Sequence, residues 1–435
     1  MTKKGVAKSL GLTLLGIVLF LVKIPGVGQS AFNFTVAFIQ DSLGTALNWV
    51  LLVFISLAWI GTLLGTVLHN SWIASVPKLK KTFVGKKMQM VTLSIALFVV
   101  FSYLFLPLDF LNVESESLLE LCGDMVVFMI IAKLVLPLLS DFGLSEMLEV
   151  YLRPIMKPFL KVPGSALINL LTGVFVSVTV AVVMVCDQFR KAVYQRKEAV
   201  ICITCMTIPS MPFTMLALNA VGQIEYFGRF YLYLVVVCLI VSAITVRLLP
   251  ISRIPEEYVG GVAADVAPLP EGPKWKQALT RASEKALATG YHPVTNVVDI
   301  VLNMISFIPY TLAWGTLMKL ILAYTNIVNI VTYPYGLWLK LFGIKQGLEL
   351  SPVIVLNFID VVMPTVLLSE VGETAVVLRI LCMTLGEMVY IAPLLIALAC
   401  NGLTNIKEQL GIWFVRLVLL VPVASLLYPV FFMGI

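Results

Sequence analysis

The stretch Cys205-Met206-Thr207-Ile208-Pro209-Ser210-Met211 occurs a second time, with three changes, as Cys382-Met383-Thr384-Leu385-Gly386-Glu387-Met388. Each copy lies inside an apolar stretch, 199–218 in the first case and 375–399 in the second. Proline or glycine in the middle of such a stretch weakens a helix and frees backbone carbonyl and N–H groups. The repeated motif therefore predicts two related halves of the chain, each with a helix that is broken in its apolar part.

The composition predicts that most of the chain lies in lipid. Of the 435 residues, 60% are hydrophobic and 12% are charged, and the mean hydropathy is +1.00. A soluble domain has about 45–50% apolar and about 25% charged residues. Apolar runs of about 18 or more residues, enough to cross a bilayer, recur along almost the whole sequence. We therefore expect an all-α polytopic membrane protein.

Several classes of function are disfavoured by what the sequence lacks. There is no P-loop, no H-E-x-x-H and no G-x-S-x-G motif, which argues against an ATP-driven pump, a metalloprotease and enzymes in general. The net charge of +6 comes from basic residues in short loops between apolar runs, so we expect no nucleic-acid partner. The seven cysteines lie in or beside apolar segments, which indicates buried thiols. No cofactor is expected.

Nine apolar stretches are predicted to cross the membrane. They are 9–24, 46–68, 88–108, 122–139, 199–218, 230–249, 294–320, 375–399 and 412–432. The first resembles a signal peptide but has no clear cleavage site, so we interpret it as a retained helix. Lysines follow the second stretch and only acidic residues follow the third, which places the N-terminus in the cytoplasm.

Two further apolar segments are predicted to enter the membrane and return on the same side. If 166–185 crossed the membrane, four basic residues, Arg190, Lys191, Arg196 and Lys197, would lie outside. A re-entrant hairpin with its tip near 173–179 avoids this, and a plain crossing helix is the alternative. The segment 352–368 is predicted to be a second hairpin. Before each hairpin comes a predicted interfacial helix, at 145–160 and at 326–342.

The prediction divides the chain into four parts. They are a three-span N-terminal scaffold (1–121), a first repeat (122–249), a cytoplasmic linker (250–293) with a polar helix at 274–289, and a second repeat (294–435). The first repeat starts outside the membrane and the second starts inside, so the repeats are inverted. Inverted repeats with broken intramembrane segments are typical of secondary transporters, which bind their solutes near the midplane.

One run of sequence resembles a known family. The residues Arg153-Pro154-Ile155-Met156-Lys157-Pro158 and the rest of the run to Gly173, followed by Tyr194-Gln195-Arg196-Lys197-Glu198-Ala199, resemble the nucleoside-recognition GATE domain over about 141–249. The whole chain resembles the YjiH family of bacterial inner-membrane proteins, including at Asn357-Phe358-Ile359-Asp360. The GATE domain is similar to half of the concentrative nucleoside transporters. Those trimeric proteins bind a nucleoside and an ion between hairpin tips and helix breaks.

The resemblance implies a multi-pass protein of the bacterial inner (plasma) membrane that forms a homo-oligomer or joins a partner membrane subunit. One feature departs from the transporters. In place of a G-Q-T-E-A-P type of hairpin tip the chain has Val176-Ser177-Val178-Thr179-Val180, which contains no carboxylate.

A small set of polar residues is predicted to bind the transported species. A charged group inside a membrane costs about 2.5–3.5 kcal/mol on insertion scales, so each one calls for a reason. Asp360 and Glu387, with Thr384, are predicted to couple transport to an ion. The predicted solute ligands are Asn169, Thr172, Ser177, Thr179, Ser210, Asn357, Asp360 and Glu387. As alternatives, Asp360 caps a half-helix, and each hydroxyl bonds back to its own helix.

The sequence therefore predicts a secondary active transporter of a small polar solute, with a nucleoside-like solute as the candidate and Na⁺ or H⁺ as the coupling ion. The alternative is a non-transporting accessory or scaffold membrane subunit with a GATE domain. The aromatic residues near the start of the span 230–249 are interpreted as an interfacial belt. They are Tyr226, Phe227, Phe230, Tyr231 and Tyr233.

Overall fold

A computed structural model of the chain describes residues 3–22, 24, 30–85, 87–106, 108–175, 178–262, 273–358, 361–387, 389, 391–400 and 402–433. These residues form α-helices and short 3₁₀ turns, with no β-strand among them. The predicted all-α fold is confirmed.

Among the described residues, five helices are long and apolar enough to cross a membrane, so the chain is a multi-pass membrane protein. They are α3 (Ala46–Thr66), α6 (Lys87–Phe105), α13 (Phe227–Thr245), α15 (Pro293–Tyr324) and α21 (Ile406–Phe431). Other predicted spans form α1 (Lys3–Leu21) and α7 (Asp109–Ser140). The two spans that contain the repeated motif are broken, as the motif predicts. A total of nine spans stays a prediction.

One compact unit, here unit 2, consists of Gln29–Leu134 and His292–Tyr333. Within it α3 and α15 both pack on α6, and the short helices α4 (Ser71–Ser75) and α5 (Pro77–Phe83) lie against α3. A Cβ atom at Gly61 or Gly65 would come within 2.8 Å of Phe83, so both glycines allow α5 to approach α3 closely.

Unit 2 also contains a helix that we did not predict, α2 (Ala31–Leu43). Ser30 caps its N-terminus by accepting a hydrogen bond from the backbone N–H of Asn33. Phe32, Val36 and Gln40 are buried at helical spacing. This pattern of a capping serine and an apolar face was readable in the sequence, but the helix is too short to be recognised as a span.

The other compact unit, unit 1, consists of Met1–Gly28, Val135–Tyr291 and Pro334–Ile435. It contains two stretches with the same order of helices. The first has α8 (Leu144–Leu160), α9 (Leu167–Phe175), α10 (Val178–Arg190), α11 (Arg196–Cys205), α12 (Met211–Ala220) and α13. The second has α16 (Ile327–Leu341), of which only the part from Pro334 onward belongs to unit 1, then α17 (Gly347–Leu356), α18 (Met363–Ser369), α19 (Thr374–Gly386), α20 (Ile391–Leu398) and α21.

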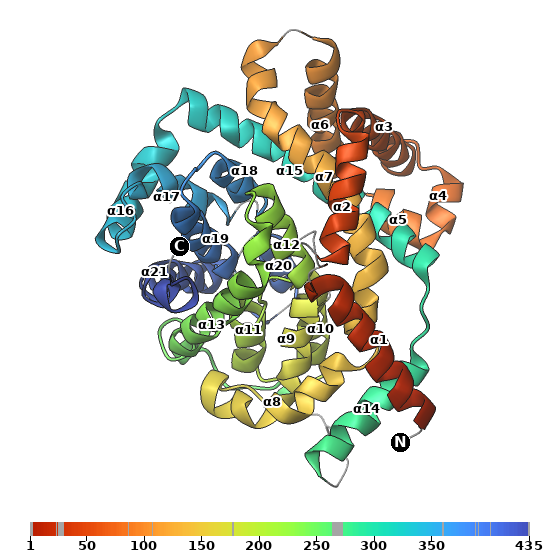
Figure 1. The fold of residues 1–435 in the computed structure, drawn as a ribbon, viewed down its shortest axis with the longest axis vertical. Coiled ribbons are helices and arrows are strands. Elements are labelled where there is room, and N and C mark those ends of the chain that lie inside the picture. The colour runs from red at the N-terminus through yellow and green to blue at the C-terminus, as the bar shows by residue number, and fades with distance from the viewer. Residues whose placement is uncertain are drawn as a thin grey trace. The chain divides into compact units, whose positions relative to one another are not determined.

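The two stretches also exchange contacts in a matching way. Helix α10 packs against α20, and α12 packs against α18. Helices α9 and α10 form the first helix pair, and α17 and α18 form the second. The broken helices are α11 with α12 and α19 with α20. In each case the second helix of one pair contacts the second half of the broken helix in the other stretch. The two long helices α13 and α21 lie side by side (Figure 1). The order of helices and the exchanged contacts match between the two stretches, and their relation as inverted repeats stays a prediction.

The interpretation of the aromatic residues at the start of α13 as an interfacial belt is wrong for four of them. Phe227, Phe230, Tyr231 and Tyr233 are buried inside the protein. The Tyr233 hydroxyl donates to the backbone oxygen of Ala424 at 2.7 Å, and its ring packs against Phe432. Tyr233 thus lies in the contact between α13 and α21, whereas the Tyr231 hydroxyl donates to the backbone oxygen of Pro209.

Both ends of the first predicted hairpin lie beside the linker. Before the hairpin, α8 packs on the linker helix α14 (Lys274–Ala288). After it, the Lys197 ammonium donates to the Glu256 carboxylate at 2.8 Å, which lowers the pKa of that carboxyl. The backbone N–H of Arg196 donates to the oxygen of Glu257. This arrangement favours a hairpin over a plain crossing helix, and its place in a membrane stays a prediction.

The linker helix α14 is tied firmly into unit 1. Helix α1 packs on α14, and Figure 1 shows the two helices crossing near the N-terminus. The Lys8 ammonium donates to the backbone oxygens of Ala286 and Thr289, at the C-terminal end of α14, at 2.7 and 2.8 Å. On the α8 side, Gly143 has a φ of +107°, and a Cβ there would come within 2.7 Å of the Ala282 Cα atom. A polar surface linker would not need such close packing.

The contact between α8 and α14 centres on Glu149, whose side chain is only 1% exposed. We expect Arg281→Met to lower the free energy of unfolding by about 1–3 kcal/mol, because the Arg281 guanidinium lies 2.5 Å from this buried carboxylate and Arg153 lies farther away, at 3.8 Å. Thermal melting of the detergent-purified protein measures the loss. The control is Lys285→Met, which removes a half-exposed partner 3.9 Å from Glu146 and should cost under about 1 kcal/mol. Equal losses in the two variants would contradict this prediction.

Candidate functional site at the second helix break

The second copy of the repeated motif ends α19 and leaves a break before α20. Helix α19 ends at Gly386, and Glu387 follows as its C-terminal capping residue. A Cβ at Gly386 would lie 2.8 Å from the side chain of Leu420, so the glycine lets α21 approach the end of α19. Glu387 itself has no exposed surface. A carboxyl group is thus enclosed at a point where the backbone hydrogen bonding of a helix stops.

Two residues from other helices hold the Glu387 carboxylate. The Asn357 amide, just after α17, donates to one carboxylate oxygen at 2.7 Å and to the backbone oxygen of Thr384 at 2.9 Å. The Trp413 indole N–H, from α21, donates to the other carboxylate oxygen. The Trp413 ring packs on Phe358, with the ring centroids 5.0 Å apart. The end of α17, the first helix of the second pair, therefore meets the helix break and α21 at Glu387.

A buried arginine satisfies the backbone of the same break. The Arg416 guanidinium, which has no exposed surface, donates to the backbone oxygens of Glu387 and Gly386, each at 3.0 Å. It also donates to the Ser242 hydroxyl at 3.1 Å. Arg416, on α21, thus places a positive charge at the same break as the buried Glu387 carboxyl group.

The site keeps an unused acceptor. The Asn357 side chain is 2% exposed, and its amide oxygen has no hydrogen-bond partner among the described residues. A buried polar atom without a partner is rare in proteins and often marks the place of a ligand or a water molecule. Together, the Glu387 carboxylate and this oxygen offer acceptors to a molecule that carries hydroxyl or amino groups.

The first break is built from neutral groups. Helix α11 ends at Cys205, whose backbone oxygen accepts a hydrogen bond from the Ser242 hydroxyl at 2.7 Å. The Tyr231 hydroxyl donates to the oxygen of Pro209 at 3.1 Å. Gly173 of α9 faces this break, since a Cβ there would lie 3.6 Å from the oxygen of Ile208. In both stretches, then, a helix of the preceding pair comes close to the break.

Of the predicted site residues that the structure describes, only Asn357 donates to the Glu387 carboxylate. The Asn169 amide is buried and donates to Gln188 and to the Tyr194 hydroxyl, both at 2.9 Å, so it ties the first helix pair together. Thr179 is exposed and Ser210 is buried at the start of α12. The hydroxyls of Thr172 and Thr384 bond back to their own helices, as our alternative stated. Ser177 and Asp360 lie outside the described residues.

Sequence reasoning missed Trp413 and Arg416. Arg416 lies inside the predicted span 412–432, and a charged residue in an apolar span is the same signal that singled out Glu387. Trp413 has no comparable signal, because tryptophan near the end of a span is ordinarily an interfacial anchor.

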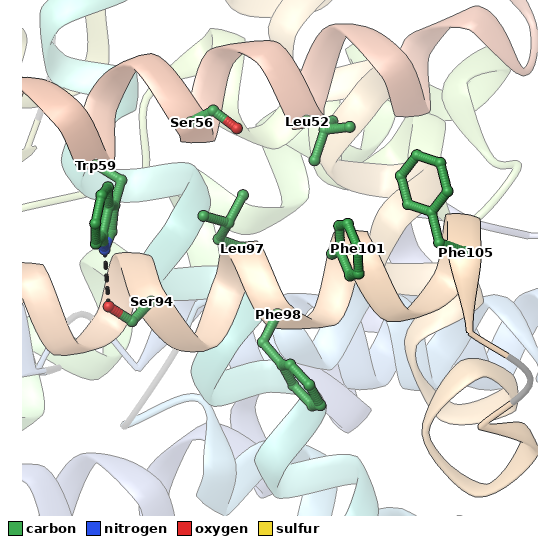
Figure 2. A pocket seen from close by; sticks show the side chains of 8 residues that line it. All are labelled: Leu52, Ser56, Trp59, Ser94, Leu97, Phe98, Phe101 and Phe105. Atoms are coloured by element: carbon green, nitrogen blue, oxygen red, sulfur yellow. Dashed lines mark hydrogen bonds between the residues drawn. The ribbon is translucent and has the colours of Figure 1, made fainter.

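A groove of about 590 Å³ in unit 2 is a poor candidate for a polar solute. Figure 2 shows it between α3 and α6, with the Trp59 indole donating to the Ser94 hydroxyl at 2.9 Å. Its lining residues are Leu52, Ser56, Trp59, Ser94, Leu97, Phe98, Phe101 and Phe105. None carries a charge, and Phe98, Phe101 and Phe105 are about half exposed, as expected of a surface that faces lipid. Across the part of the chain that the structure covers, no cluster of acidic, histidine and cysteine side chains is suited to hold a metal ion.

Comparison with known families identifies part of the chain. Residues 123–224 match the Gate family, which is described as nucleoside recognition. The chain carries a Gate domain. The predicted resemblance to the GATE domain is thereby confirmed, with a match at 123–224 where the sequence suggested about 141–249. The Gate domain includes the first helix pair and the first break, whereas Glu387 and Arg416 lie beyond it.

The Gate domain and the apolar helices support a role in membrane transport and point away from catalysis. An uncharacterized protein of Alkalihalophilus pseudofirmus is 28% identical to this chain over 327 residues, which are 72% of this chain and 69% of the relative. No solved structure matches the chain.

Proposed function

We propose that this protein is a secondary active transporter of a small polar solute, driven by Na⁺ or H⁺ and working by alternating access. The observation that carries the proposal is the enclosed Glu387 carboxylate at a helix break, held by Asn357 from the adjacent helix pair. Intramembrane carboxyl groups are costly and mark the paths of solutes and ions in transporters. Broken helices beside them supply the freed backbone groups that such sites use.

The acceptor groups of the site favour a solute rich in hydrogen-bond donors. The Glu387 carboxylate and the Asn357 amide oxygen accept hydrogen bonds from hydroxyl or amino groups, which a nucleoside carries on its sugar and its base. The Gate domain, whose description is nucleoside recognition, supports the same class of solute. Asp360, Ser177 and Thr179 are proposed to complete the site.

Alternating access would change the contacts that the two stretches exchange. The pairs α10 with α20 and α12 with α18 join one helix pair to the other stretch's broken helix. Movement of a helix pair at these contacts would open the break to one side of the membrane at a time. We also propose that the protein lies in a bacterial inner membrane as a homo-oligomer, with its N-terminus in the cytoplasm.

The second candidate is a non-transporting accessory or scaffold subunit. Two observations favour it. The first helix pair has no carboxylate at its predicted tip, and the Thr172 hydroxyl is bonded to its own helix rather than turned toward a ligand. Such a protein would need a partner membrane subunit and would bind no solute.

A ligand screen separates the two candidates. The purified protein is melted in detergent with nucleosides, amino acids, dipeptides and organic acids, at several pH values with and without Na⁺. A solute present at 100 times its dissociation constant adds about 2.7 kcal/mol to the stability, which gives a clear rise in melting temperature. We expect a stabilising solute that is also accumulated by proteoliposomes under an ion gradient. If no solute in the panel stabilises the protein and none is taken up, the accessory subunit is the better assignment.

A further inference from the structure

The C-terminal ends of two half-helices are held by the same few residues in unit 1. Helix α11 ends at Cys205 and α19 ends at Gly386. The last carbonyl oxygens of a helix have no partner within it and carry the negative end of the helix dipole. Two such ends, together with the Glu387 carboxylate, create a buried region that calls for a positive charge.

Arg416 serves both ends. It donates directly to the backbone oxygens of Gly386 and Glu387 at 3.0 Å. It also donates to the Ser242 hydroxyl at 3.1 Å, and that hydroxyl donates in turn to the backbone oxygen of Cys205 at 2.7 Å. One fully buried guanidinium therefore balances the negative end of the α19 dipole by direct contact and that of the α11 dipole through the Ser242 hydroxyl.

Half-helix ends of this kind are where broken-helix transporters hold a coupling Na⁺. Here the carbonyl oxygens of Gly386 and Glu387 that such an ion would use already accept hydrogen bonds. The guanidinium is always protonated in proteins, so its charge is permanent. A free cation at the same point would lie beside that charge in a medium of low dielectric constant and would be repelled.

We propose that Arg416 is a fixed internal cation that takes the place of a coupling Na⁺ between the ends of α11 and α19, so that this position binds no free cation. The inference rests on the proposed function in one respect: for a transporter it means that the solute binds equally well with and without Na⁺. Whether a free cation occupies the position between α11 and α19 can be tested on the purified protein without any solute.

The test compares melting temperatures in NaCl, in choline chloride and in choline chloride with guanidinium at a concentration too low to denature. We expect the wild type to melt at the same temperature in NaCl and choline chloride. Arg416→Ala should melt at a lower temperature and recover part of the loss, saturably, when guanidinium or Na⁺ fills the vacated position. Arg416→Lys keeps a positive charge and should remain indifferent to Na⁺.

The matched control is Arg247→Ala. Arg247 also donates to helix-end carbonyl oxygens, those of Pro158 and Phe159 at 3.0 Å, but it lies at an exposed position. Its loss should not be recovered by guanidinium or by Na⁺.

Two results would overturn the inference. One is a saturable, Na⁺-specific stabilisation of the wild type that Glu387→Gln removes. The other is a saturable stabilisation of Arg416→Lys by Na⁺, which can be measured even if Arg416→Ala does not fold. Neither depends on the solute screen, so failure of the proposed function and failure of this inference are distinguishable.

Discussion

Glu387→Gln is expected to abolish solute binding and uptake while the protein still folds and enters the membrane. Glutamine keeps the size of the side chain but replaces an acceptor oxygen with an NH₂ group. That group would face either the Asn357 amide or the Trp413 indole, both of which are donors. Losing a buried, charged acceptor costs about 2–5 kcal/mol, and about 3 kcal/mol corresponds to a loss of more than 100-fold in affinity.

The measurement is the dissociation constant of a solute found in the screen, together with its uptake by proteoliposomes. Glu149→Gln is the matched control, because Glu149 is an equally buried glutamate that pairs with arginines in the α8–α14 contact, away from the break. It should alter the melting temperature and leave the affinity unchanged. Full affinity in Glu387→Gln, or an equal loss of affinity in both variants, would remove Glu387 from the solute site.

Much of this site could be found from the sequence, because the signals that mark it are local. The motif at 382–388 predicts a helix break, since glycine weakens the helix where its counterpart has proline. Glu387 and Asn357 stand out as polar residues within apolar sequence. The order of a single helix, a helix pair, a broken helix and a long helix also follows from periodicity and charge, and the structure has this order twice. The interfacial position of the single helices stays a prediction.

The contacts between these residues could not be predicted, because they depend on packing between distant segments. Asn357 and Glu387 are 30 residues apart and meet only because α17 packs on α19. Tyr233 has the composition of an interfacial belt residue, yet it is buried against α21. The polar composition of α14 predicts a solvated helix, whereas the alanines at 278, 282 and 286 let it pack against α1 and α8. In each case tertiary contact overrides a local signal.

Asn357→Asp should give the largest loss of stability at neutral pH. The new carboxylate would lie at the position of an amide that now donates to Glu387 at 2.7 Å, and it would also withdraw the donor from the Thr384 oxygen. Two adjacent carboxylates cannot both stay ionised in a buried site, and Arg416 can balance only one of them. An uncompensated buried charge costs on the order of 3–5 kcal/mol, which thermal melting in detergent detects readily.

The pH dependence identifies the cause of that loss. A single proton shared between the two carboxyl groups removes the repulsion, so protonation is favoured in the folded state more than in the unfolded state. The stability of Asn357→Asp should therefore recover as the pH falls and decrease as the pH rises. Asn357→Ala removes the same donor without adding a charge, and its smaller loss of about 1–3 kcal/mol should not show this recovery.

The exchange variant Asn357→Asp with Glu387→Gln provides the strictest test of the contact. It restores one carboxylate, now at position 357, facing one amide donor at position 387. Its stability at neutral pH should exceed that of Asn357→Asp alone, because the pair again has one charge and one donor for Arg416 to balance. If the exchange variant is less stable than Asn357→Asp, then these two side chains do not form the pair described at the second helix break, and the solute site proposed on that pair fails with it.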